Sequence, residues 1–266
     1  MAEIDSILKA RGVMSLAEYA DMINSRTFIS TNYPELDRLI GGGIPVNCIT
    51  EVFGLPAVGK SRFVKDICIK NHALYIDTEN SLPADEYNFL TSNNVDVISE
   101  NTIETIWGIV NDAIDITDNP YKLIVIDSLA ATVTTSEIAQ DTDINMSSML
   151  SQAKALTVWL KTLLNKLNGS NVAVVFVNHK KIKPGPIPAV TTPGGAAVKF
   201  YSSLRLDFSA NKSDLNAKNE TLSVTVKLAK TRFSTPNTSC KIKMKLNYKD
   251  NYDSQSTIYN PEDSDD

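Results

Sequence analysis

Short apolar runs alternate with amphipathic stretches through most of the chain. Runs of strand length occupy residues 48–53, 73–77, 95–98, 122–127 and 171–178. Stretches with helical spacing of apolar residues lie between them, at 60–70, 102–116 and 147–168. Nearly continuous apolar strands that alternate with helices are typical of a parallel sheet covered by helices on both faces. We therefore expect an α/β fold with a mostly parallel sheet.

Period-two alternation in the last third of the chain predicts further strands. They fall at 204–208, 222–229 and 240–248, with a polar turn at 211–219 between the first two. We expect these strands to form an antiparallel extension beyond the parallel core. Near the other end, a short helix after Ile29 should end at Gly41–Gly43, and Ser15 to Glu18 fits a capping box within a helical segment 1–26.

One segment carries no hydrophobic period at all. Residues 180–195 follow an apolar strand and hold three lysines, four prolines and a Gly-Gly pair. Long loops without regular structure are uncommon inside compact domains and are usually functional. We therefore expect this loop to be a functional segment that contacts a ligand or partner.

Composition narrows the class of protein. The chain has 266 residues, 42% of them hydrophobic and 21% charged, as expected for a globular domain with a sizeable core. No apolar run approaches the length of a membrane span, and MAEIDSILKARG lacks the apolar core of a signal peptide. We expect a cytoplasmic protein with no membrane partner. Cys48, Cys68 and Cys240 are read as reduced thiols, and with two histidines they form no zinc-ligand spacing.

The charge is unevenly distributed. The formal net charge is −5, but residues 250–266 contain six acids and neither Lys nor Arg. Without these acids the rest of the chain carries +1. The sequence therefore predicts a nearly neutral core, residues 27–249, with an acidic disordered tail, residues 250–266.

A glycine-rich loop supplies the strongest chemical signal. Residues 54–61, GLPAVGKS, fit G-x-x-x-x-G-K-[ST], and they follow an apolar strand and precede a helical stretch. In such loops backbone N–H groups surround phosphates, the lysine reaches the β- and γ-phosphates, and the serine hydroxyl binds Mg²⁺. A chance glycine-lysine turn is the alternative. We predict that ATP is bound by Gly54, Leu55, Pro56, Ala57, Val58, Gly59, Lys60, Ser61 and Arg62.

Two strand-end acids could complete this site. Asp127 ends the run LIVID and is predicted to complete the Mg²⁺ site with Ser61, acting through Ser61 or a metal-bound water; a turn or cap role is the alternative. Asp77 and Glu79 follow ALYI at a spacing of two, which predicts that they share a strand face, with Glu79 at the mouth. Glu79 would orient or deprotonate the attacking water, and a solvated strand-end acid is its alternative.

These segments, in this order, resemble the RecA/RadA recombinase family over about residues 27–249. ISTNYPELDRLIGGGIP and ITEVFGLPAVGKS are similar to the segment leading into the P-loop of archaeal RadA. YIDTENSL resembles the bacterial segment that holds the catalytic glutamate, which falls on Glu79, and LIVIDSLAA with SEIAQDTD resembles the Walker B strand and first DNA-binding loop. TTPGGAAVKFYSSLRLDF resembles the end of the second DNA-binding loop. The resemblance implies a RecA-type P-loop NTPase fold.

The resemblance also implies roles for residues that no pattern singles out. VKLAKTRFSTP places Lys230 and Arg232 against the ATP of a neighbouring subunit, where they would join Glu79 and Lys60 as catalytic residues; a solvated basic strand is the alternative. Tyr87 would flank the adenine, or else fill a surface groove. His179 stands where the family usually has the glutamine that senses the γ-phosphate and signals to the second loop.

The predicted DNA contacts lie on the second loop. The expected binding is independent of sequence and acts on phosphates, through Lys180, Lys181, Lys183, Gly194, Gly195 and Lys199, with Arg205 beyond them. The first loop is acidic and offers only backbone donors. We expect the acidic tail to compete with DNA at low salt.

The function expected is that of an ATP-dependent DNA recombinase, a DNA-dependent ATPase that uses ATP and Mg²⁺. It would form filaments on single-stranded DNA and promote homologous pairing and strand exchange with duplex DNA. No segment matches the accessory domains of RecA or RadA, so duplex engagement should be weaker or need a single-strand-binding or mediator protein. Two alternatives stay open: a hexameric RecA-fold motor, and a RadB-like mediator or annealing factor with little ATP turnover.

Overall fold

The structure is a computed structural model that describes residues 13–18, 21, 25–139, 146–183, 189–216 and 221–245. The predicted acidic tail, most of the N-terminal segment and residues 140–143 of the predicted first DNA-binding loop lie outside the described residues. In the part of the N-terminal segment that is described, Ser15 and Glu18 exchange the two hydrogen bonds of a capping box, at 2.7 and 3.2 Å. The neighbouring Leu16 is 85% exposed and so contributes nothing to the core of its own chain.

A nine-stranded sheet forms the centre of the molecule, in the order β11-β12-β10-β3-β7-β6-β4-β5, with β13 paired to β12. Its strands are β3 (Ile49–Gly54), β4 (Ala73–Asp77), β5 (Val95–Ser99), β6 (Leu123–Asp127), β7 (Ala173–His179), β10 (Leu204–Ser209), β11 (Leu215–Asn216), β12 (Thr221–Lys230) and β13 (Ser239–Lys245). The strands from β10 to β5 run parallel, and β11, β12 and β13 pair antiparallel. The prediction of a mostly parallel sheet is confirmed. The prediction for 204–208 is corrected, because β10 pairs parallel with β3 and so belongs to the core.

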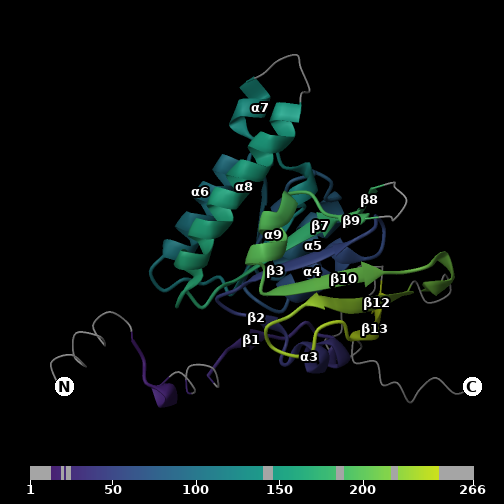
Figure 1. Cartoon of the computed structure of the whole chain (residues 1–266). Coiled ribbons are helices and arrows are strands. Elements are labelled where there is room, and N and C mark those ends of the chain that lie inside the picture. Colours follow the sequence, from purple (N-terminus) through teal and green to yellow (C-terminus); the bar gives the residue numbers. More distant parts are fainter. Residues whose placement is uncertain are drawn as a thin grey trace, which may run out of the picture.

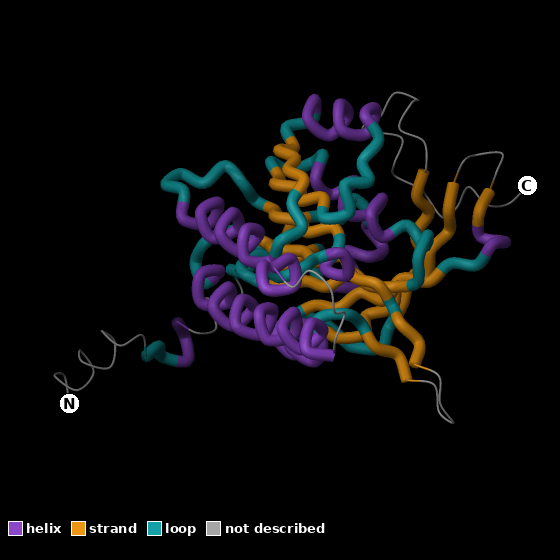
Figure 2. Tube along the Cα trace, turned by 90° about the horizontal axis from the view of Figure 1, so that it is seen from above, coloured by secondary structure: helices purple, strands orange, loops and turns teal. Residues whose placement is uncertain are grey.

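Helices cover both faces of this sheet, and Figures 1 and 2 show the strands between them. The alternation along one strand explains why: in β6, Leu123 and Val125 pack into one apolar cluster, and Ile124 and Ile126 into the other. The first cluster takes in α3 (Pro34–Ile40), α4 (Lys60–Cys68) and α5 (Ala84–Ser92). The second takes in α6 (Ile103–Asp115), α8 (Met146–Leu167) and α9 (Gly195–Tyr201). Smaller elements are β1 (Phe28–Ile29), β2 (Ile44–Pro45) and α7 (Thr135–Ala139).

Two segments differ from the sequence predictions. Helix α5 was not predicted, although Pro83 stands at its start and Asp85 and Glu86 lie in its first turn, as is usual for a helix N-terminus. Its apolar positions are few, and only Leu90 is buried. The segment 180–195 is also more regular than expected, because β8 (Lys181–Lys183) and β9 (Ala189–Thr191) pair antiparallel as a hairpin.

The cysteine and membrane predictions can be compared with the described residues. Cys48, Cys68 and Cys240 are all free thiols, as predicted. The described part of the chain brings no cluster of His, Cys, Asp or Glu together that could hold a metal by itself. None of its helices has the length and hydropathy needed to cross a bilayer.

Candidate nucleotide site

A cavity of about 770 Å³ lies where four neighbouring strands of the sheet end. Strands β3, β7, β6 and β4 are adjacent and parallel, so their carboxyl ends gather at one edge, the usual ligand position in open α/β sheets. The cavity brings together most of the predicted nucleotide residues, namely Pro56, Ala57, Val58, Gly59, Lys60, Ser61, Arg62, Glu79, Asp127 and His179. Val177 of β7, Ala210 and Asn211 after β10, and Leu222 of β12 complete the lining and were not predicted.

The glycine-rich loop has the backbone geometry of a phosphate cradle. Gly54 ends β3, and a Cβ there would lie 2.4 Å from the carbonyl oxygen of Phe208. Gly59 is the N-cap of α4, with φ of 85°, and a Cβ there would meet the Met244 methyl at 2.3 Å. Only glycine fits either position without a shift. The N-terminus of α4 therefore opens into the cavity with its N–H groups available to an anion.

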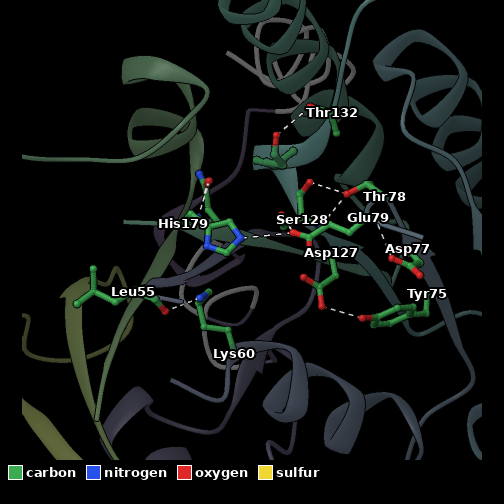
Figure 3. A network of polar contacts seen from close by, with 12 residues as sticks. Leu55, Lys60, Tyr75, Asp77, Thr78, Glu79, Asp127, Ser128, Thr132 and His179 are labelled. Carbon is green, nitrogen blue, oxygen red and sulfur yellow. Dashed lines mark hydrogen bonds and ion pairs between the residues drawn. The ribbon is translucent and has the colours of Figure 1, made fainter. Parts of the chain in front are cut away.

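Figure 3 shows the Lys60 side chain between Leu55 and Asp127. The Lys60 ammonium donates to the Leu55 carbonyl at 2.8 Å. Burial lowers the pKa of Lys60, whereas Asp127 and Glu79 favour its charged form. Asp127 is itself 7% exposed, and burial raises the pKa of its carboxyl group. Hydrogen bonds from the hydroxyls of Tyr75, at 2.7 Å, and Ser61 act in the opposite direction and keep the carboxylate aligned.

Glu79 is fixed at the cavity wall by groups from three strand ends. The Ser128 hydroxyl donates to Glu79 Oε1 at 2.8 Å, and His179 Nε2 lies 3.4 Å from the same oxygen. The Thr78 hydroxyl donates to the Ser128 carbonyl and accepts from the Ser128 N–H, both at 2.7 Å, which locks the ends of β4 and β6 together. Ser128 and Thr78 flank the predicted acids in sequence, but they carry no motif that would have identified them.

The predicted pairing of Asp77 with Glu79 on one strand face is wrong, because β4 ends at Asp77. The Asp77 carboxylate accepts the backbone N–H groups of Glu79, Ser81 and Leu82, at 3.1, 2.9 and 3.1 Å. Asp77 therefore shapes the turn that carries Glu79 and does not face the cavity. Three N–H donors satisfy a buried carboxylate that would otherwise be costly.

These residues fit a nucleoside triphosphate with magnesium. The cradle offers N–H donors and a lysine for phosphate oxygens, and Ser61 with Asp127 offers the oxygen ligands that Mg²⁺ prefers. Tyr87, by contrast, is not brought into this cavity. It is 45% exposed and lines a separate hollow with Asn80, Leu82 and Asn88. An adenine contact through Tyr87 thus finds no support within one chain.

Lys230 and Arg232 lie at the opposite edge of the sheet. Strand β12 runs antiparallel to β10, so it ends near the start of β3, where Lys230 is level with Arg205 and Arg205 with Glu51. The Lys230 ammonium donates to the carbonyls of Lys199 and Phe200 at 2.8 Å each, at the end of α9. Neither side chain can reach phosphates held by the P-loop of its own chain.

The predicted DNA contacts divide into paired and exposed groups. Lys180 forms a two-pronged ion pair with Asp207, at 2.8 and 3.0 Å, and Arg205 pairs with the buried Glu51 and stacks 4.4 Å from the Phe53 ring. Both cations thus have carboxylate partners within their own chain, which the sequence prediction did not include. Lys181 is exposed and Lys199 partly so. The side chain of Lys183 lies outside the description.

Gly194 and Gly195 both adopt positive φ, 83° and 67°, at the start of α9. A Cβ on Gly194 would lie 2.8 Å from Val198 Cγ2. The glycine pair thus permits a tight entry into α9.

A buried polar cluster connects the cavity to this helix, and no sequence pattern indicated it. The Asn178 amide donates to Glu51 Oε1 and to the Pro193 carbonyl, both at 3.0 Å, and its oxygen accepts the N–H of His179 at 2.9 Å. Glu51 is fully buried. His179, which lines the cavity, thus directly follows Asn178, whose side chain holds the Pro193 carbonyl at the end of the second DNA-binding loop.

Comparison with known proteins agrees with this geometry. Residues 1–250 match the family model described as the RecA N-terminal domain. Protein RecA of Leptospira meyeri is 32% identical over 224 residues, which cover 78% of this chain and 56% of the relative. Protein RecA of Bordetella pertussis is 29% identical over 255 residues, covering 88% and 69%, and that of Bdellovibrio bacteriovorus is 29% identical over 252, covering 89% and 64%. The chain thus spans little more than half of the Leptospira relative's length. The family-model match over residues 1–250, together with the P-loop and the strand order, shows that the chain belongs to the RecA family.

Proposed function

We propose that this RecA-family chain is a DNA-dependent ATPase that forms filaments on single-stranded DNA and promotes homologous pairing and strand exchange. One observation carries the proposal. A P-loop, Asp127 and Glu79 share one cavity with His179, and His179 stands on the strand that leads directly into the β8–β9 hairpin. The site that would hold ATP is therefore continuous with the segment that would touch DNA.

Each residue of the cavity has a role that follows from its position. Lys60 and the loop N–H groups bind the β- and γ-phosphates, and Ser61 and Asp127 hold Mg²⁺. The bound ion supplies neutralisation of charge that develops on the phosphate oxygens. Glu79, held by Ser128 and facing the cavity, orients the attacking water and accepts its proton.

The signal from ATP to DNA passes through His179 and Asn178. A change at His179, which contacts Glu79 at 3.4 Å, moves the peptide whose N–H is bound by the Asn178 side chain. Asn178 also holds the Pro193 carbonyl, just before Gly194 and α9. We propose that this contact sets the position of the second loop according to the nucleotide.

Assembly completes the site. Lys230 and Arg232 lie at the edge of the sheet away from their own P-loop, and we propose that they stabilise phosphate charge in trans on a neighbouring subunit. The exposed Leu16 is consistent with docking of residues 1–26 on such a neighbour. Lys181 and Lys199 contact DNA phosphates, and the acidic tail, residues 250–266, competes with DNA at low salt.

The test combines three measurements on the full chain. ATP hydrolysis is measured with and without single-stranded DNA for the wild type and for Glu79→Gln, alongside strand exchange and electron microscopy of filaments. We expect hydrolysis that DNA stimulates, its loss in Glu79→Gln with nucleotide binding retained, and filaments that exchange strands. DNA-stimulated hydrolysis without strand exchange would instead favour the mediator function, and closed rings would favour the hexameric motor.

A further inference from the structure

A second polar cavity, of about 440 Å³, lies at the edge of the sheet opposite the P-loop. Its lining comes from residues 25–27, from the segment 45–48 that leads into β3, from the loop between α8 and β7, from the residue before β10, and from the segment just after β12. Strands β3 and β7 both begin here. The cavity is therefore separated from the nucleotide site by the full length of the parallel strands.

The cavity holds two arginines and no acid. Arg26 and Arg232 both line it, and every other described residue of the lining is neutral. Within the described part of the chain, neither guanidinium has a carboxylate within ion-pair distance. Two like charges that share one cavity repel each other, and an anion between them removes that cost. The remaining lining offers Asn47, Asn168 and Asn171 as further polar groups.

Arg26 is held in place although it is exposed. Its guanidinium lies 5.4 Å from the ring centre of Phe233, within range of a cation–π contact. The Phe233 ring is in turn packed edge-on against Phe28 of β1, at 5.7 Å. The arginine thus rests on a supported ring beside Arg232.

Cys48 lines the same cavity as the two arginines. Burial raises the pKa of the Cys48 thiol, while Arg26 and Arg232 each act to lower it. The thiol is half-buried, lies next to the first residue of β3 and lines the same cavity. It therefore provides a natural probe of whether the cavity is filled.

We propose that Arg26 and Arg232 together form an anion site that receives the phosphates of the nucleotide bound to a second copy of this chain, with Arg26 as a further residue of the trans contact. This inference rests on the proposed function. The P-loop of the same chain cannot supply the anion, because the six residue steps from Cys48 to Gly54 span about 20 Å of extended strand. A head-to-tail assembly brings one edge of a subunit against the opposite edge of the next, and so would place this cavity over a neighbour's P-loop.

Mixed assemblies test whether Arg26 acts in trans. Arg26→Ala, which keeps an intact P-loop, should lower DNA-stimulated ATP hydrolysis at least about tenfold. Glu79→Gln should be inactive but retain Arg26. In a 1:1 mixture about half of the intact P-loops face a subunit with Arg26, so the rate should recover to about half of the wild-type rate per intact P-loop. No recovery, or a rate of Arg26→Ala equal to wild type, would overturn the proposal. Arg38→Ala, which removes an exposed arginine of α3, is the control and should have no effect.

Alkylation of Cys48 tests the site without relying on hydrolysis. In a Cys240→Ser background, with Cys68 fully buried, MgATP and DNA should slow alkylation of Cys48 at least about threefold, and Arg26→Ala should abolish this protection. If millimolar inorganic phosphate alone protects Cys48 equally, the cavity binds free anions and the assignment to a second copy fails. If protection depends on Arg26 but the wild type does not hydrolyse ATP, the proposed function fails and the anion site stands.

Discussion

The hydrogen bond from Tyr75 to Asp127 offers a direct test of the proposed magnesium ligand. Tyr75 is 2% exposed, and its hydroxyl lies 2.7 Å from Asp127 Oδ2. The bond lowers the pKa of Asp127, against a buried environment that raises it. Tyr75→Phe removes this donor and leaves a space too enclosed for bulk water to replace it. The pKa of Asp127 should therefore rise further.

The size of the shift follows from the strength of the bond. A hydrogen bond to a charged acceptor contributes about 1.5–3 kcal/mol, and one pKa unit corresponds to about 1.4 kcal/mol. The pKa of Asp127 should thus rise further, in the direction in which burial already moves it. Since the ionised carboxylate is the form that binds Mg²⁺, activity is lost at a higher pH on the acid side. Above the new pKa, Asp127 is ionised again and the rate should approach that of the wild type.

The assay is the pH dependence of kcat/KM for ATP hydrolysis, which reports groups of the free protein. Tyr33→Phe is a matched control, because Tyr33 is also buried and its hydroxyl lies 2.7 Å from Asp66, a carboxylate outside the cavity lining. Both variants should lose about 1–3 kcal/mol in free energy of unfolding, but only Tyr75→Phe should shift the acid limb. An acid limb that stays in place, or one that moves equally in both variants, would refute the role of Asp127.

Three further changes test other parts of the structure. Gly194→Ala and Gly169→Ala both place alanine at positive φ, at a cost of about 1–2 kcal/mol in free energy of unfolding. Only at Gly194 does the added Cβ have a neighbour within 3 Å, so urea denaturation should show the larger loss of stability for Gly194→Ala. Equal losses in the two variants would contradict the clash. Lys181→Ala, at an exposed lysine, should lower the slope of log K for DNA binding against log salt concentration by about one. Lys180→Ala breaks an ion pair with Asp207, so it should lower the free energy of unfolding and leave that slope unchanged. The reverse pattern would show that Lys180 is the DNA contact. Arg205→Met should lower the free energy of unfolding by about 3–5 kcal/mol, because it leaves the fully buried carboxylate of Glu51 without its cation. The double variant Arg205→Met, Glu51→Leu should recover most of that loss.

Much of the fold and of the cavity could be predicted because the relevant signals are local. The P-loop is a contiguous segment whose glycines are required by the backbone itself, as the close approach of Phe208 and Met244 shows. Asp127 could be placed because it ends an apolar strand, and parallel strands end at one edge. Helix α5 was missed since it buries only Leu90 and so leaves almost no apolar period to detect.

The ion-pair partners of the charged side chains could not be predicted from the amino-acid sequence. Lys180 looks like a DNA contact among its lysine neighbours, yet it pairs with Asp207, and Arg205 pairs with Glu51 across 154 positions of the chain. The amino-acid order determines which segments become strands, helices and a phosphate cradle, because backbone preference and apolar period act between near neighbours. Strand order and register decide which charged side chains pair with one another. They also place Lys230 and Arg232 at the edge of the sheet away from the P-loop, because the antiparallel strand β12 ends where the parallel strands begin.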